Sequence, residues 1–297
     1  MSADDPLVRR SATASIATWA RPRNEAPGGP SAGTDGQRRR LLSALGLVAA
    51  AGLAGCAAGP RIDTSYRALS QGPRVDLLIL HYTVLDFPTS LRVLTQQEVS
   101  SHYLVDIDPP TIYRLVDEDQ RANHAGVSFW QRRHLLNTSS IGIEIVNRGY
   151  VDTAAGRVYT PYPPAQIEAV VGLVRDIVKR YDIKPDRVLG HSDIAPGRKQ
   201  DPGPLFPWKR LADEGLVVWP DPARVAAQRP LYELQLPDVA WFQQRLARMG
   251  YFVPLWGELD NATRDVLISF QMKFRPARYD GTPDAETAAI LAALTAP

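Results

Sequence analysis

The chain has 297 residues, which is long for a single hydrophobic core and comfortable for two domains. Its net charge of +2 and scattered basic residues argue against a nucleic-acid partner, and its 44% hydrophobic and 22% charged residues are typical of an ordinary globular protein. The single cysteine excludes a disulfide within the chain, so the cysteine count neither requires nor excludes an oxidising compartment.

The first 55 residues have the composition of an export signal. Residues 1–37 are rich in proline, glycine, serine and charge, and we expect a disordered leader there. Three arginines (residues 38–40) then precede an apolar run over residues 41–55, which is typical of a signal peptide. A membrane-spanning helix needs about 20 apolar residues, so this run is too short to span comfortably. The arginines also resemble a twin-arginine signal, which leaves the export route open.

The apolar run ends at the one cysteine. Leu53-Ala-Gly-Cys56 resembles a bacterial lipobox, in which the cysteine is lipidated and becomes the mature N-terminus. The alternative is a small buried residue within a helix, but the position, the flanks and the Ala-Ala-Gly-Pro that follows favour lipidation at Cys56. Ala57, rather than an aspartate, follows the cysteine, and the resemblance to enterobacterial lipoproteins implies sorting to the outer membrane. We therefore predict an outer-membrane lipoprotein that faces the periplasm and contacts the membrane through its lipid.

Residues 56–220 alternate short apolar runs with one long amphipathic segment. The runs predict strands, and residues 164–181 predict a helix with one buried apolar stripe. This pattern predicts an α/β domain with a mixed β-sheet flanked by helices, and with its chemistry in loops at the strand ends. The predicted strands cover residues 75–80, 103–107, 111–115, 141–146 and 188–189.

A loop rich in proline and glycine carries the densest group of chemically active residues. Residues 191–204 contain His191, Lys199 and Asp201, and a loop stiffened in this way holds its side chains in fixed directions. His81 directly follows the strand predicted over residues 75–80. Zinc hydrolases take three ligands from His, Cys and carboxylate groups and keep a fourth position for water. The alternative for each histidine is a hydrogen-bonded place in the core, and for Asp201 a role in an Asp-Pro-Gly turn.

Glu144 lies in a run whose apolar residues fall on both faces of the predicted strand. Such strands are buried on both sides, so a carboxylate there is costly without a partner. The ordinary explanation for a glutamate at this position is that it forms a salt bridge or faces an edge of the sheet. Beside a metal-bound water, the same carboxylate would be a general base.

Four segments in this order resemble the zinc-dependent N-acetylmuramoyl-L-alanine amidases, specifically the lipoprotein branch of Gram-negative cell envelopes. They are His81-Tyr-Thr83, residues 100–106, residues 141–147 and residues 191–204, and the resemblance covers roughly residues 60–215. It implies a Zn²⁺ ion on His81, His191 and Asp201, with Glu144 as catalytic glutamate and Lys199 as assisting lysine. It also implies that the substrate is peptidoglycan or muropeptides, cut between N-acetylmuramic acid and L-alanine.

Two further polar residues are candidates for binding the substrate. His124 resembles a family position that lines the substrate cleft, and packing within its loop is an equal alternative. Asn147 closes the motif that begins at residue 141, and we expect it to contact substrate. His102 is expected to be structural and His134 to lie on the surface.

The remainder of the chain predicts a second, helical domain. We expect a proline-rich linker over residues 221–231 and three helices within residues 232–295, with Gly250 as a helix stop and Asp260 and Thr282 as N-caps. This pattern resembles a small peptidoglycan-binding module. The alternative is an accessory domain that only packs on the enzyme.

Two other functions stay open. A zinc peptidase that cuts peptidoglycan peptides would use the same ligands, whereas a non-catalytic wall-binding lipoprotein would be expected to have lost at least one of them. A glycosidase is disfavoured, because it would need two flanking carboxyl groups and no metal trio.

Overall fold

The computed structural model describes residues 60–154 and 156–296. The expected leader, the signal peptide and the lipidation site Cys56 lie outside this range. Residues 67–297 form a separate unit from residues 1–66, and all the helices and strands belong to the described residues of this second unit. In the described part of the chain, no helix is long and apolar enough to cross a membrane.

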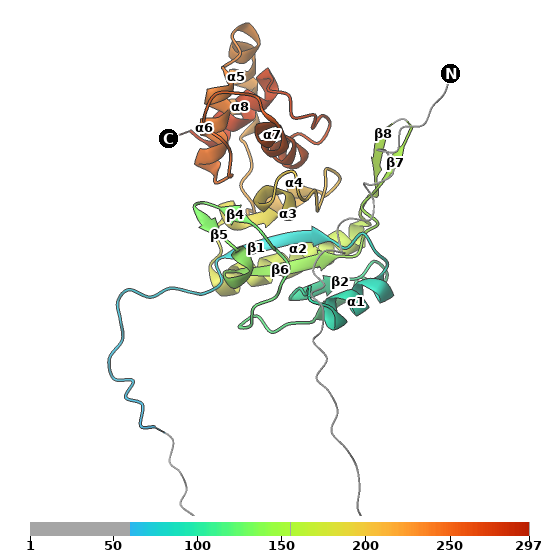
Figure 1. Cartoon of the computed structure of the whole chain (residues 1–297), viewed down its shortest axis with the longest axis vertical. Helices are drawn as coiled ribbons and strands as arrows, with labels where there is room; N and C mark the ends of the chain where they lie inside the picture. The colour runs from blue at the N-terminus through green and yellow to red at the C-terminus, as the bar shows by residue number, and fades with distance from the viewer. Residues whose placement is uncertain (1–59, 155, 297) are drawn as a thin grey trace, which may run out of the picture. The chain divides into compact units, whose positions relative to one another are not determined.

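The central element is a five-stranded mixed sheet (Figure 1). Its strand order is β3-β2-β6-β1-β9; β2, β6, β1 and β9 run parallel, and β3 pairs antiparallel with β2. The mixed sheet flanked by helices is as predicted. The strands are β1 (Leu77–Tyr82), β2 (Tyr103–Val105), β3 (Ile112–Arg114), β6 (Ser140–Ile145) and β9 (Val188–Gly190).

Strand β1 is buried on both faces, and its side chains alternate between two cores. Leu78 and Leu80 face the core on one side of the sheet, and Leu77 and Ile79 face the core on the other side. The strand continues past the expected end at residue 80, so His81 lies within it on the same face as Leu77 and Ile79. The strand therefore sets the direction of the first candidate ligand.

One face of the sheet is covered by helix α2 (Pro164–Tyr181), whose bounds match the prediction. Its apolar stripe, which includes Val170, Val174 and Ile177, packs in one cluster with Leu78, Leu80 and the three isoleucines of β6. Pro164 occupies the first turn, where a missing N–H is tolerated, and Asp182 ends the helix in the left-handed conformation. This helix holds the sheet on the side away from the candidate site.

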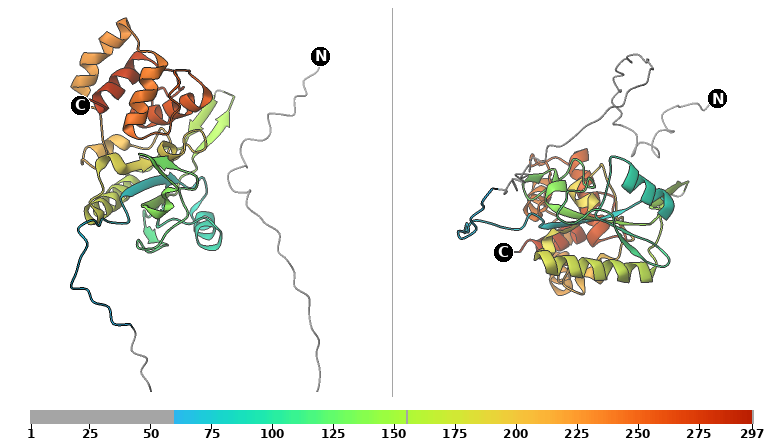
Figure 2. Two further views of the ribbon diagram at one scale, coloured as in Figure 1. Left: turned by 60° about the vertical axis from the view of Figure 1, so that its left-hand side comes forward. Right: turned by 90° about the horizontal axis from the view of Figure 1, so that it is seen from below.

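The opposite face is covered by the short helix α3 (His191–Ile194) and by C-terminal helices (Figures 1 and 2). Leu77, Ile79 and Leu189 share a hydrophobic core with residues of the C-terminal helices such as Phe242 and Phe270. The C-terminal helices are α5 (Pro222–Leu234), α6 (Val239–Met249), α7 (Asn261–Phe274) and α8 (Ala285–Leu294). The last three are the three helices predicted for residues 232–295.

The ends of these helices follow simple capping rules, with one correction. Gly250 ends α6 at a φ of 126°, and the Asp260 carboxylate accepts the Thr263 N–H at the start of α7, both as predicted. Thr282 is not the N-cap of α8. Asp284 caps that helix by accepting the Thr287 N–H, with the same Asp-x-x-Thr spacing as at α7.

The segment expected to be a linker is largely helical. Asp221 accepts the Ala223 N–H, Pro222 fills the first turn, and α5 continues through Pro230 to pack on α8. Proline is tolerated in a first helical turn, which explains why Pro222 starts this helix. The domain boundaries themselves stay a prediction.

Several shorter elements were not predicted, and most of them border the sheet. Two antiparallel hairpins, β4–β5 and β7–β8, form separate two-stranded sheets. These elements are α1 (Phe87–Gln96), β4 (Phe129–Trp130), β5 (Arg133–His134), η1 (Leu136–Thr138), β7 (Tyr150–Thr153), β8 (Gly156–Tyr159), η2 (Pro185–Arg187) and α4 (Trp208–Ala212).

Candidate metal centre

The three predicted ligands come from segments far apart in the sequence and meet at one edge of the sheet. His81 lies near the end of β1, and His191 opens α3 directly after β9. Since β1 and β9 are parallel neighbours, their carboxyl ends lie together. The loop after α3 then brings back Asp201, whose backbone oxygen accepts the Ser192 N–H at 2.9 Å.

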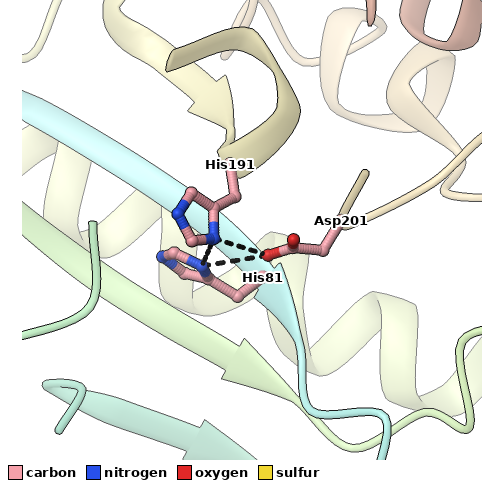
Figure 3. Close-up of side chains that lie close together, drawn as sticks. All are labelled: His81, His191 and Asp201. Atoms are coloured by element: carbon pink, nitrogen blue, oxygen red, sulfur yellow. Dashed lines mark hydrogen bonds and ion pairs between the residues drawn. The ribbon is translucent and has the colours of Figure 1, made fainter. Parts of the chain in front are cut away.

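The side chains of these three residues converge on a single point (Figure 3). The Nδ1 atoms of His81 and His191 are 2.9 Å apart, and the Asp201 Oδ2 atom lies 3.1 Å from the first and 3.0 Å from the second. All three residues are buried. Two imidazole nitrogens and one carboxylate oxygen are a donor set that suits zinc and leaves one position for water. The residues therefore fit the metal that the sequence predicts.

A chain of hydrogen bonds beneath His81 fixes which of its nitrogens is free to bind a metal. The Ser140 hydroxyl donates to the Leu136 carbonyl at 2.7 Å, so it accepts from His124 Nε2 at 3.1 Å. His124 Nδ1 is then an acceptor for the His81 Nε2–H at 3.0 Å. This order leaves a lone pair on His81 Nδ1, which faces the other two ligands.

The second histidine is oriented in the same manner. His191 Nε2 lies 3.2 Å from the Ala125 carbonyl, which also accepts from the Arg198 guanidinium at 2.9 Å. A carbonyl can only accept, so His191 carries its proton on Nε2 and keeps the Nδ1 lone pair for a metal. Both histidines thus present Nδ1 through supports built into the fold.

Electrostatics keeps two of the ligands, His81 and Asp201, in the deprotonated state that binds metals. Burial and the neighbouring His191 lower the pKa of His81 to about 4. Burial alone would raise the pKa of Asp201, but its contacts with His191 and His81 hold that pKa well below its usual range. Deprotonated ligands are needed for zinc, because bound protons compete with the metal.

Glu144 lies next to the ligands on the same face of the sheet. It pairs with His81 in the register of β6 and β1, and its Oε2 atom is buried with no hydrogen-bond partner among the described residues. Burial and the nearby Asp201 raise the pKa of Glu144 to about 8, while Lys199 acts in the opposite direction. A carboxyl group in this state can accept and return a proton near neutral pH.

Lys199 occupies the loop that also carries Asp201. Its charge lowers the pKa of both His81 and Glu144, so its ammonium group acts on the centre. Its backbone N–H donates to the Ala195 carbonyl at 3.0 Å, and Gly197 turns the loop with a φ of 74°. The loop thus brings a cation to the site where negative charge would develop in an amide hydrolysis.

The two residues expected to bind substrate are both anchored within the protein. His124 is buried beneath His81 in contact with Gly142, where any Cβ atom would overlap its ring. Asn147 donates to the carbonyls of Thr160 and Pro161 and accepts the Gly149 N–H. Their contacts with substrate stay predictions.

Two other histidines lie as expected. His102 is buried, with Nδ1 accepting the Gly142 N–H at 3.0 Å, and His134 is exposed on β5. The structure adds Ser140 and Gly142, which sequence reasoning missed. Residues two apart on a strand lie on the same face, so the spacing of residues 140, 142 and 144 could have predicted that both lie on the face of Glu144.

Comparisons with known proteins agree on both parts of the chain. Residues 71–204 match the N-acetylmuramoyl-L-alanine amidase family, and residues 235–291 match the putative peptidoglycan binding domain. The chain is 46% identical over 267 residues to the N-acetylmuramoyl-L-alanine amidase AmiD of Escherichia coli, covering 84% of this chain and 95% of that protein.

Two solved structures share the fold and contain muropeptides. One is E. coli AmiD with the substrate anhydro-N-acetylmuramic acid-L-Ala-D-gamma-Glu-L-Lys (TM-score 0.73, 44% identity, 80% of this chain and 94% of that one). The other is AMPDH3 of Pseudomonas aeruginosa with an anhydromuramic pentapeptide (TM-score 0.74, 44% identity, 79% of this chain and 97% of that one).

Proposed function

Since this chain belongs to the N-acetylmuramoyl-L-alanine amidase family, we propose that its hydrolysis uses a zinc ion held by His81, His191 and Asp201. The enzyme hydrolyses the amide between N-acetylmuramic acid and L-alanine in peptidoglycan or muropeptides. The observation that carries the zinc proposal is the convergence of the two Nδ1 atoms and one carboxylate oxygen. In each histidine the other ring nitrogen is held by a hydrogen bond within the protein.

The residues around the ligands supply the proton transfers. When bound, zinc supplies Lewis-acid chemistry that lowers the pKa of a water towards about 7. Glu144 accepts a proton from the attacking water at its carboxylate while the water oxygen bonds to the amide carbon. Lys199 stabilises the negative charge that develops on the carbonyl oxygen. As the carbon–nitrogen bond breaks, Glu144 returns the proton to the amine of L-alanine.

The substrate follows from the relatives. Both structural neighbours hold anhydromuramyl peptides, and we propose that this enzyme also accepts such peptides. Residues 235–291, which include α6, α7 and most of α8, match a putative peptidoglycan binding domain, and this match supports wall binding by that part of the chain. A zinc peptidase would cut within the peptide, so the two functions differ in their products.

The place of action is a proposal drawn from the sequence. Lipidation at Cys56 would anchor the enzyme in the outer membrane, facing the periplasm and the cell wall. The lipobox-like segment that ends at Cys56 supports this.

Mass spectrometry of defined anhydromuramyl peptides tests the proposed function. The full chain should release a free stem peptide that begins with L-alanine, a chelator should stop this release, and added zinc should restore it. Cleavage inside the stem peptide would support the peptidase. Activity that survives complete removal of metal would overturn the zinc proposal.

A further inference from the structure

The helix that carries His191 is held by side chains from the C-terminal helices. The Asp193 carboxylate accepts the Gly190 N–H at 2.8 Å and the Lys273 ammonium at 2.9 Å on Oδ2. Its Oδ1 atom accepts the Tyr251 hydroxyl at 2.6 Å. The side chain of Asp193 is 1% exposed and that of Lys273 is 5% exposed, so this ion pair is buried. Lys273 belongs to α7, and Tyr251 directly follows the end of α6.

Asp193 controls the geometry of two candidate ligands. It is the third residue of α3, and its carboxylate holds the backbone of Gly190, the residue before His191. Between His191 and Asp193, the Ser192 N–H donates to the backbone oxygen of Asp201. A rotation or shift of α3 would therefore move both His191 and Asp201. Metal sites depend on such outer contacts, because they fix the orientation of the ligands.

Lys273 is enclosed by the sheet domain. Its ammonium donates to the Val188 carbonyl at 3.3 Å and lies 4.1 Å from the centre of the Trp208 ring. Trp208 also packs against Gly190, where an added Cβ atom would lie 3.2 Å from the indole. Without the lysine, Asp193 would be a buried charge lacking its counter-ion, and the start of α3 would be expected to rearrange.

The same helix α7 also touches the turn of the metal-binding loop. Gly197 lies against Asp265, and a Cβ atom at Gly197 would overlap that carboxylate. Helix α7 thus contacts the segment that runs from His191 to Asp201 at two points, Asp193 and Gly197.

We propose that the C-terminal helical domain is a structural part of the metal centre. Lys273 and Tyr251 are positioning residues that hold α3 through Asp193 and thereby set the directions of His191 and Asp201. This inference rests on the proposed metal centre. It gives the domain a role in catalysis that is separate from binding the cell wall.

Zinc affinity in the full chain tests this inference. The variants are Lys273→Met, which removes the charge, and Tyr251→Phe, which removes one oxygen and keeps the ring on Trp130. Competition with a chromophoric chelator should show zinc binding weakened by about tenfold in each, the scale seen for outer-shell contacts. On an anhydromuramyl peptide, kcat should fall while KM stays near that of the parent. Lys273→Arg should recover part of both losses.

Arg245→Met is the matched control, because Arg245 bonds to Thr295 within the C-terminal domain. It should lower the melting temperature and leave zinc affinity unchanged. Tyr251→Phe keeps the test valid if Lys273→Met does not fold. Parental zinc affinity and kcat in Tyr251→Phe and in any folded Lys273→Met would overturn the inference. A parent chain that binds no zinc would instead overturn the proposed metal centre, and this inference with it.

Discussion

Replacing Glu144 with glutamine should stabilise the metal-free protein while abolishing hydrolysis. Burial raises the pKa of Glu144 from 4.5 to about 8, so the folded chain keeps a proton that the unfolded chain releases over that range. The stability of the parent therefore falls as the pH rises through this window. Glutamine has no proton to lose, so the variant escapes this penalty, and it cannot serve as a general base.

The size of the effect follows from the pKa change. Each pH unit inside the window costs about 1.4 kcal/mol, so between pH 4.5 and about pH 7 the parent loses at most about 3.5 kcal/mol. Glu144 is partly exposed although its Oε2 atom is buried, and we expect about 2 kcal/mol after allowing for solvent screening. Near pH 5 the advantage of the variant should shrink below about 1 kcal/mol.

Urea unfolding in the presence of a chelator, at about pH 5 and about pH 7, measures this difference. Glu168→Gln is the control, because that exposed carboxylate is paired with Arg210 and its pKa is lowered. The control should gain no stability at either pH. If Glu144→Gln gains no stability at neutral pH, or gains equally at both pH values, the pKa of Glu144 is not raised in the folded protein.

Three further predictions concern the site and the anchor. Lys199→Met should lower kcat about 100-fold with little change in KM, as measured by steady-state kinetics, since the lysine acts on developing charge; a change confined to KM would contradict that role. His124→Leu removes the acceptor of the His81 Nε2–H, so zinc binding should weaken at least about tenfold in competition with a chelator. Ser140→Ala should have a smaller effect. Unchanged zinc affinity in both variants would show that this chain of hydrogen bonds does not orient His81. Cys56→Ser should move the protein from the membrane fraction to the soluble fraction of cells, and an unchanged distribution would exclude the lipid anchor.

The sequence predicted the features that depend on local pattern. The apolar runs that precede His81 and surround Glu144 predicted two buried strands, and the apolar stripe over residues 164–181 gave α2 its correct bounds. The Asp-x-x-Thr spacing at Asp260 also gave a correct N-cap. These signals are carried by neighbouring residues, so one sequence is enough to detect them.

Contacts between distant segments could not be predicted in the same way. The contacts of His124 with His81 and Ser140, and of Lys273 with Asp193, join residues that are separated by 16 to 80 positions. The helix across residues 222–234 was hidden because its prolines are typical of linkers, and its packing on α8 stabilises it. Tertiary packing decided each of these cases.

The most direct test of the central claim is a crystal structure of the enzyme grown with zinc, with diffraction recorded on both sides of the zinc absorption edge. We expect one anomalous peak, bound by the Nδ1 atoms of His81 and His191 and by the Asp201 carboxylate, next to Glu144. A zinc peak elsewhere, with these three side chains still bonded to one another, would contradict it.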